Sequence, residues 1–320
     1  MSAYFARNYE GSSDLDSLIH FAQVLTGAHL PDKHYYHAGN FVWQLYAFKA
    51  SDNVRLWWRD SGDAEIIACG LFEPPLTFQF VLHPDLLHQK DLAAEVIRWA
   101  DQRRATVANK RDIPLAYQRL GSDTLSTEAN DTDSARIALL TEHGYTQHLD
   151  AGIHFSRILD DSLPDVVLPQ GARFRPIPDG DADARAELHR DAWSVWGESK
   201  HTNELYRLLR GAPLYDPDLD IVLEFEGQLV SYCICWLDTV NRVGLFEPVG
   251  TRPALARRGF GRAVIREGLR RLRDKGMIRA FVGTASINKP AAALYASAGF
   301  DFIERSHSYV KHDLATKNHE

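Results

Sequence analysis

The stretch Leu245–Ala263, LFEPVGTRPALARRGFGRA, decides the expected fold of the second half of this 320-residue chain. In it an apolar strand ends, a loop follows, and a turn rich in glycine and arginine opens a long helix. Gly259 and Gly261 let the backbone approach a ligand closely. The first turn of a helix leaves amide N–H groups unpaired and carries the positive end of the helix dipole. The stretch therefore predicts a phosphate-binding turn, to which the neighbouring arginines add positive charge.

Hydrophobic periodicity predicts strands and helices on both sides of this stretch. Val264, Ile265, Leu269 and Leu272 recur at helical spacing, and Glu226-Gly227 is typical of a hairpin turn. Arg262, Arg266, Arg270 and Arg273 lie on another face of the same helix and are expected to be solvated. The expected elements are, in order, a strand (173–177), helices (181–193 and 203–210), strands (220–225, 229–237 and 242–250), a helix (259–275), a strand (279–284), a helix (290–297) and a final strand after Gly299.

The first half repeats this plan with much divergence. HPD at 83–85 corresponds to RPA at 252–254, and NDTDSARIALLTEHGY at 130–145 corresponds to NKPAAALYASAGF at 288–300. Between the halves lies DDSLPDVVLPQG, which has the prolines and acids of a linker. We therefore expect one domain over residues 1–160, a linker over 161–171 and a second domain over 172–320.

Composition excludes several classes of protein. The chain is 45% hydrophobic and 25% charged, as in soluble globular proteins, and has no run of 18 apolar residues. Residues 1–10 lack the pattern of a signal peptide, which predicts a cytoplasmic location. The formal net charge of −7 argues against nucleic acid as a partner. The spacing of Cys233 and Cys235 favours packing over metal binding, and no metal site is expected.

Two motifs in the second half resemble the GNAT superfamily of N-acetyltransferases. The first is Ala256–Gly261, where the family carries Arg/Gln-x-x-Gly-x-Gly/Ala; Ala256 departs from that pattern. The second is Asn288, followed by Leu294-Tyr295 and Gly299-Phe300. The doubled architecture is most similar to bacterial tandem GNAT proteins, a group that includes mycothiol synthase. The resemblance implies an α/β (α+β) fold of two tandem domains, each a mixed, mostly antiparallel twisted sheet flanked by helices.

The resemblance also implies acetyl-CoA as co-substrate, direct transfer of the acetyl group to an amine, and a set of site residues. Tyr295 matches the general acid that protonates the leaving thiolate, although it could be a core tyrosine. Glu247 is the candidate general base, or an acid that binds a substrate cation or caps a loop. Asn288 either contacts the pantetheine arm or caps a helix. The implied cofactor-binding residues are Val249, Gly250, Thr251, Arg257, Arg258, Gly259, Phe260, Gly261, Arg262 and Asn288.

The first half lacks this chemistry at the matching positions. Lys90 and Leu92 replace the two glycines, Phe78 replaces the candidate base, and Leu140 replaces the candidate acid. The acids at 91 and 95 would repel a pyrophosphate. We therefore expect a degenerate GNAT-like domain without a productive CoA site, which acts in structure or in substrate binding.

The acceptor is expected to be a small-molecule amine held by aromatic and acidic side chains. The candidate substrate-binding residues are Trp193, Trp196, Glu198, Tyr215, Trp236 and Asp238. The tryptophans could instead pack between the two halves, and the aromatic stretch 34–48 could complete a cleft or an interface. The alternatives are a non-catalytic acyl-CoA-binding or regulatory protein and a protein N-acetyltransferase. We expect a monomer or a homodimer, with neither nucleic acid nor membrane as a partner.

Overall fold

The computed structural model describes residues 4–30, 36–47, 50–60, 65–74, 76–87, 89–107, 124–197, 199 and 201–312. Glu198 therefore lies outside the described residues, as do residues 34, 35 and 48 of the aromatic stretch 34–48. The elements of the first half are β1 (Tyr4–Asn8), α1 (Ser12–His29), α2 (Ala38–Ala47), β2 (Val54–Arg59), β3 (Ile66–Glu73), β4 (Thr77–Leu82), α3 (Lys90–Val107), β5 (Thr124–Asn130), α4 (Ser134–Glu142) and β6 (Thr146–Ile158).

The second half repeats the same order of elements. It contains β7 (Ala172–Arg175), α5 (Ala182–Trp193), α6 (Asn203–Arg210), β8 (Asp220–Phe225), β9 (Gln228–Asp238), β10 (Val243–Thr251), α7 (Phe260–Asp274), β11 (Arg279–Ala285), α8 (Lys289–Ser297) and β12 (Asp301–His312). Both halves also place a proline at the start of a short 3₁₀ helix, η2 (Pro84–Leu86) and η7 (Pro253–Leu255). The expected repeat and the α/β class are confirmed, with mostly antiparallel strand pairs and helices on the sheet faces.

The chain folds into two compact units whose limits differ from the expected division at the linker. Unit 1 comprises residues 1–28, 50–152 and 304–320, and unit 2 comprises residues 29–49 and 153–303. Helix α2 therefore belongs to unit 2, although it is encoded in the first half. Most of β12 belongs to unit 1, where it pairs antiparallel with β5.

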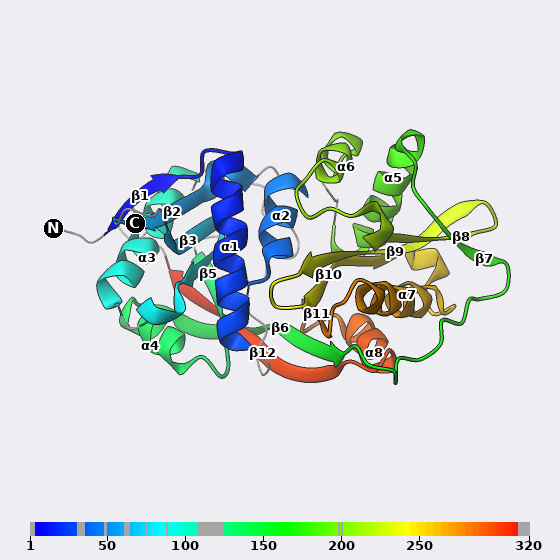
Figure 1. Cartoon of the computed structure of the whole chain (residues 1–320). Coiled ribbons are helices and arrows are strands. Elements are labelled where there is room, and N and C mark those ends of the chain that lie inside the picture. Colours follow the sequence, from blue (N-terminus) through cyan, green and yellow to red (C-terminus); the bar gives the residue numbers. More distant parts are fainter. Residues whose placement is uncertain are drawn as a thin grey trace, which may run out of the picture. The chain divides into compact units, whose positions relative to one another are not determined.

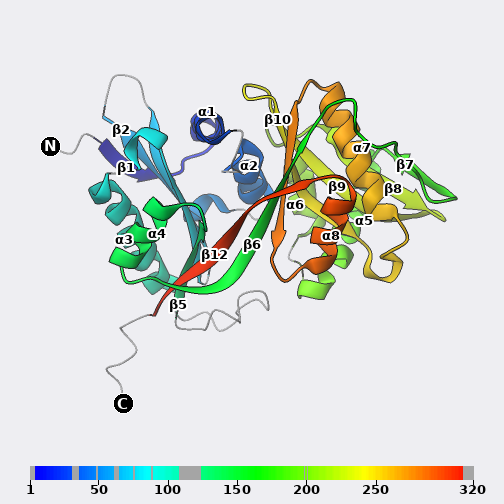
Figure 2. The ribbon, with the colours of Figure 1, turned by 90° about the horizontal axis from the view of Figure 1, so that it is seen from below.

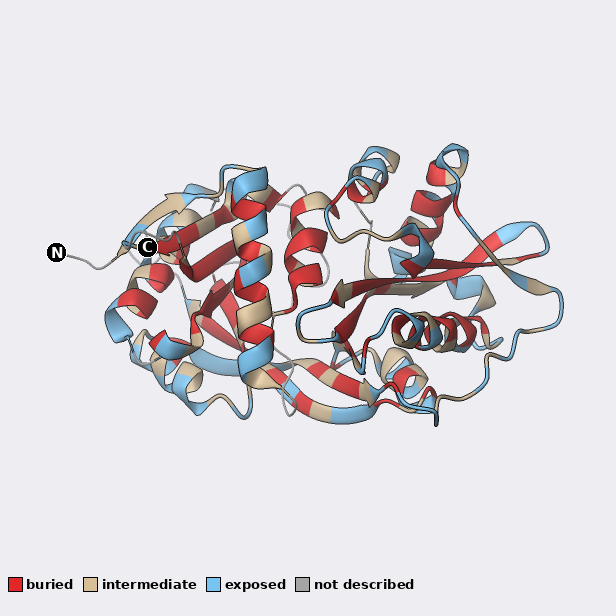
Figure 3. Ribbon diagram, viewed as in Figure 1, coloured by how far each residue is buried: buried red, intermediate tan, exposed pale blue. Residues whose placement is uncertain are grey.

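In unit 2, helices cover both faces of the sheet β7–β8–β9–β10–β11. Helix α7 packs on one face, and α5, α6 and α2 lie on the other (Figures 1 and 2). Burial follows this arrangement, since the sheet-facing sides of α5 and α7 are buried and their outer sides are exposed (Figure 3). Cys233 and Cys235 are free and buried on the α7 side, so their shared face serves packing.

Local sequence explains the turns of unit 2. Glu226 and Gly227 both have positive φ, 51° and 77°, as the turn of a two-residue hairpin between β8 and β9 requires. Apolar residues of α7 at helical spacing, including Val264 and Leu269, are fully buried against the sheet. Within the described ranges, no helix is both long enough and apolar enough to cross a membrane.

Candidate functional site

Strand β10 leaves one backbone edge open at its C-terminal end. It runs parallel to β11 from Val243 to Phe246, and in the described chain this pairing ends there. The pairing with β9 continues on the other side after a register shift between Phe246 and Val249, up to Thr251. The edge of Val249–Thr251 that faces away from β9 therefore offers N–H and C=O groups to an extended ligand.

The glycine turn meets the end of this strand. Arg257 and Gly259 have positive φ, 62° and 90°, and α7 begins at Phe260 without a side-chain cap at its N-terminus. A Cβ atom on Gly261 would lie 3.2 Å from Oγ1 of Thr251, so the first turn of α7 packs closely on the end of β10. The open edge and the unpaired amides of the helix thus lie next to each other.

The arginines near the turn differ in what they contact. Arg257, Arg258 and Arg262 are exposed, and the guanidinium of Arg258 lies 4.6 Å from the ring centroid of Phe225. Phe260 is 1% exposed and packs in the core, so it contributes only its backbone to the turn. Further along α7 the arginines bind within the protein: Arg266 donates to the carbonyl of Asp165, and Arg270 pairs with Glu267 and Asp274.

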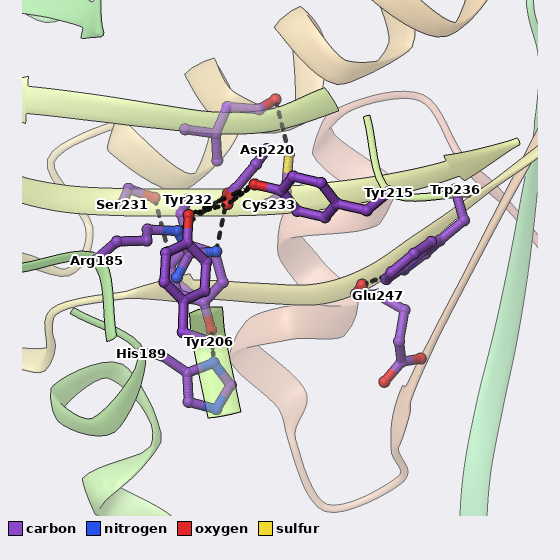
Figure 4. Close-up of polar contacts among 12 residues, drawn as sticks. Arg185, His189, Tyr206, Tyr215, Asp220, Ser231, Tyr232, Cys233, Trp236 and Glu247 are labelled. Atoms are coloured by element: carbon purple, nitrogen blue, oxygen red, sulfur yellow. Dashed lines mark hydrogen bonds and ion pairs between the residues drawn. The ribbon is translucent and has the colours of Figure 1, made fainter. Parts of the chain in front are cut away.

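The two predicted catalytic residues lie close enough to interact electrostatically. Tyr295, on α8, is 5% exposed and packs against the rings of Phe155 and Phe300. Burial raises its pKa above the ordinary value, and the negative charge of Glu247 raises it further. Glu247 is only partly buried; its carbonyl accepts a hydrogen bond of 2.6 Å from Nε1 of Trp236, and its carboxylate points away from that indole (Figure 4).

Asn288 caps helix α8. Its Oδ1 accepts a hydrogen bond of 3.2 Å from the amide of Ala291, and Pro290 stands in the first turn. The structure thus places this side chain on the helix terminus, which was one of its two predicted roles.

A buried polar network lies on the α5 and α6 side of the sheet. Asp220 accepts hydrogen bonds from the hydroxyls of Tyr206 and Tyr215, at 2.7 and 3.0 Å, and from Nε of the buried Arg185 at 3.0 Å. The guanidinium of Arg185 stacks 3.6 Å from the ring centroid of Tyr232 (Figure 4). One carboxylate therefore holds together residues of α5, α6 and β8.

Two histidines extend this network in the neutral form. Burial lowers the pKa of His189 well below its ordinary value, and burial lowers that of His201 to about 4. Burial also raises the pKa of Tyr232, so its hydroxyl stays protonated, and this hydroxyl and Nδ1 of His189 share a hydrogen bond of 2.6 Å. Trp193 in turn donates to the oxygen of Tyr232 at 3.0 Å.

Sequence reasoning missed Arg185, His189, Tyr206 and Tyr232. One signal was available: Arg185 and His189 stand four residues apart on the predicted helix, in the same stripe as the buried Ala182 and Ala186. The tyrosines gave no comparable signal, because a tyrosine in an apolar segment is normally a core residue.

The predicted substrate residues fall into two groups. Trp193 is exposed, while Trp196 and Tyr215 are partly buried. Trp236 and Asp238 are fully buried, and Asp238 accepts hydrogen bonds from the amides of Val240 and Asn241 in the β9–β10 turn. Glu198 lies outside the described residues. In the part of the chain that the structure covers, no group of three His, Cys, Asp or Glu residues could hold a metal ion.

Three of the four matching positions in unit 1 are apolar core positions. Phe78, Leu92 and Leu140 are each fully buried in its hydrophobic core. Lys90 begins α3 and forms an ion pair of 2.8 Å with Glu142. An open glycine turn is therefore not formed at the start of α3.

Comparisons with known proteins agree with this geometry. Residues 185–300 match the sequence profile of the Acetyltransferase (GNAT) family. A mycothiol acetyltransferase from Streptomyces bingchenggensis is 29% identical over 150 residues, which are 46% of this chain and 48% of the relative. Another, from Pseudarthrobacter chlorophenolicus, is 24% identical and covers 75% of this chain and 79% of the relative. The chain spans about half the length of the first curated relatives that it matches.

Solved structures with a similar fold cover almost the whole chain. A GCN5-related N-acetyltransferase from Sphaerobacter thermophilus has a TM-score of 0.63 at 17% identity, over 98% of this chain and 96% of that one. A tandem GNAT protein from the clavulanic acid biosynthesis pathway has a TM-score of 0.62 at 14% identity, over 97% and 98%. Residues 185–300 thus match the GNAT acetyltransferase family model, and the whole chain has a fold similar to that of a tandem GNAT protein.

Proposed function

We propose that unit 2 is an acetyl-CoA-dependent N-acetyltransferase that acts on a small-molecule amine by direct transfer in a ternary complex. The observation that carries this proposal is the open edge of Val249–Thr251 beside the uncapped start of α7. An extended pantetheine arm fits the strand edge, and a pyrophosphate fits the amides of Gly259–Arg262.

The residues around the turn suit such a co-substrate. Gly259 and Gly261 are partly exposed, and neither carries a side chain of its own that would cover the amides of the turn. Arg257 and Arg262 are exposed beside them and supply positive charge for phosphate groups. Ala256 provides no side-chain contact, so the grip on the pyrophosphate depends on the amides and on these arginines.

Acetyl-CoA would supply an acyl group activated as a thioester. Glu247 then removes a proton from the attacking amine, directly or through water, as the new N–C bond forms. Tyr295 donates its proton to the sulfur as the C–S bond breaks. The raised pKa of Tyr295 supports this role, because the phenol is fully protonated at neutral pH before the reaction.

The acceptor is proposed to approach from the α5 and α6 side. Trp193, Trp196 and Tyr215 retain surface there and can enclose an amine. The curated relatives are named mycothiol acetyltransferases, which supports a small-molecule acceptor. Unit 1 is proposed to be a degenerate domain without a productive CoA site, because three of the matching positions are core residues and the fourth is Lys90, which pairs with Glu142.

A thiol-release assay with acetyl-CoA and a panel of amines tests the function, and calorimetry gives the number of CoA sites. We expect one CoA per chain and amine-dependent release of free thiol. One CoA bound without thiol release from any amine supports a non-catalytic acyl-CoA-binding protein. Release with peptide amines alone supports a protein N-acetyltransferase, and two CoA sites contradict the degenerate role of unit 1.

A further inference from the structure

Helix α2 is built into unit 2, although it precedes the other elements of that unit by more than a hundred residues. It packs on α6 and on strands β9 and β10. Trp43 of α2 lies 5.6 Å from the ring of His201 and 5.8 Å from that of His189, measured between centroids. At the start of the helix, Nδ1 of the buried His37 accepts a hydrogen bond of 2.9 Å from the amide of Gly39. Trp43 thus fixes the middle of α2 in unit 2, while the hydrogen bond to His37 caps the first turn of the helix.

Gly39 brings the backbone of α2 directly onto the indole of Trp236. A Cβ atom at this position would lie 2.4 Å from Cγ and 2.5 Å from Cβ of Trp236. These atoms belong to the base of a fully buried side chain, which cannot move aside as the end of a flexible chain can. Helix propensity alone favours alanine over glycine here, so the glycine is explained by the contact with Trp236.

Trp236 contacts the candidate base, Glu247, as well as Gly39. Its Nε1 donates a hydrogen bond of 2.6 Å to the carbonyl of Glu247, at the register shift in β10 (Figure 4). The segment between Phe246 and Val249 lacks the regular pairing with β9 that holds the rest of the strand. The hydrogen bond from Trp236 therefore constrains the backbone of Glu247 at a point where the regular ladder is interrupted.

We propose that Gly39 and Trp236 are positioning residues for Glu247, so that the first half of the chain sets the geometry of the active site in unit 2. The catalytic part of this inference rests on the proposed function. Gly39 acts through Trp236, and Trp236 acts through the carbonyl of Glu247; neither contacts the reacting atoms.

The test is Gly39→Ala in the full chain, with Gly70→Ala as the matched control. A Cβ atom on Gly70 would lie 2.5 Å from Cζ3 of Trp99, which is a comparable contact between a glycine and a tryptophan, but in unit 1. We expect Gly39→Ala to lower kcat at least tenfold, to shift the acid limb of the pH–rate profile, and to change KM for acetyl-CoA less than twofold. Gly70→Ala affects thermal stability but leaves the pH profile at its wild-type position.

A double-mutant cycle separates positioning from general damage. Trp236→Phe keeps a ring but removes the Nε1 donor, and it is expected to reproduce most of the loss in kcat. If Gly39 acts through Trp236, adding Gly39→Ala to Trp236→Phe lowers kcat by less than threefold further. Fully additive losses overturn the proposal.

Hydrogen exchange gives a readout that does not depend on activity. We expect faster exchange at the amides of Glu247 and Val249–Thr251 in Gly39→Ala than in the wild type and in Gly70→Ala. Faster exchange in a protein that acetylates no amine would sink the proposed function and keep the positioning role. Unchanged exchange, or an unchanged kcat in an active enzyme, overturns the positioning role alone.

Discussion

The carboxylate of Glu247 on β10 interacts electrostatically with the phenol of Tyr295 on α8. After burial, the Glu247 carboxylate is the largest contribution to the raised pKa of Tyr295. In the proposed function these two residues act as acid and base on the two sides of one acyl transfer, and each can be removed separately.

Tyr295→Phe removes the proton donor and keeps the ring that packs on Phe155 and Phe300. We expect turnover to fall on the order of 10²-fold or more, with little change in the affinity for CoA. Steady-state kinetics and calorimetry measure the two quantities. Turnover equal to that of the wild type would take Tyr295 out of the mechanism.

Glu247→Gln keeps the backbone carbonyl that accepts from Trp236 but removes the carboxylate. A lower rate and the loss of the acid limb of the pH–rate profile are expected, because the amide cannot accept the proton of the amine. A profile from pH 5 to 9 with saturating acetyl-CoA provides the measurement. If the mutant keeps the acid limb, another group is the base.

Gly261→Asp places a side chain where only 3.2 Å separates the new Cβ from Thr251 and adds a negative charge at the start of α7. Because an anion there repels a pyrophosphate, we expect the Kd for CoA to rise at least tenfold. Gly180→Asp, where a Cβ atom would meet nothing within 4 Å, is the matched control. Equal affinities for CoA in the two variants would show that the pyrophosphate does not bind at this turn.

Asn288→Ala removes the cap of α8 and is expected to destabilise unit 2 by about 1 kcal/mol. Asn288→Asp keeps a good capping side chain and should retain most of that stability. Chemical denaturation gives the stabilities, and calorimetry shows whether either variant binds CoA more weakly. Weaker CoA binding in both variants would favour a direct contact of Asn288 with the co-substrate.

The neutral histidines predict the direction of the pH dependence of stability. The pKa of His201 is lowered from 6.5 to about 4 in the folded chain, so between these values the unfolded state binds more protons. The contribution of the neutral His201 to the free energy of unfolding is fully present above about pH 6.5 and is lost as the pH falls toward 4. His201→Phe removes this titration and should flatten the fall, whereas His20→Gln on the exposed side of α1 should not. Urea midpoints at pH 7.5, 6 and 5 make the comparison; parallel curves for all three proteins would exclude His201 as a cause.

The sequence was most informative where a local rule determines the structure. The spacing of Val264, Ile265, Leu269 and Leu272 predicted the buried face of α7, and Glu226-Gly227 predicted the hairpin, because helix period and positive φ are set within a few residues. The repeat likewise predicted the order of elements in the first half of the chain. The roles predicted for the turn residues, Glu247 and Tyr295 remain predictions.

The features that the sequence did not predict, such as the burial of Trp236 and Arg185, depend on contacts between distant parts of the chain. The sequence suggested Trp236 as a substrate-binding residue. In the structure its side chain is fully buried, and the backbone of Gly39 packs directly on it. No local sequence pattern connects residues 39 and 236. Arg185 owes its buried position to Asp220, 35 residues away. Pairings of this kind are decided by which helix covers which face of the sheet, and this is known only once the chain has folded.

The crossings of the chain between its units, at residues 28/29, 49/50, 152/153 and 303/304, constrain how the protein can be divided. A gene fragment cut at the 161–171 segment would deprive unit 2 of α2 and unit 1 of most of β12, so each product would lack a piece of its own core. Exchange of modules with a relative therefore has to transplant α2 together with residues 153–303.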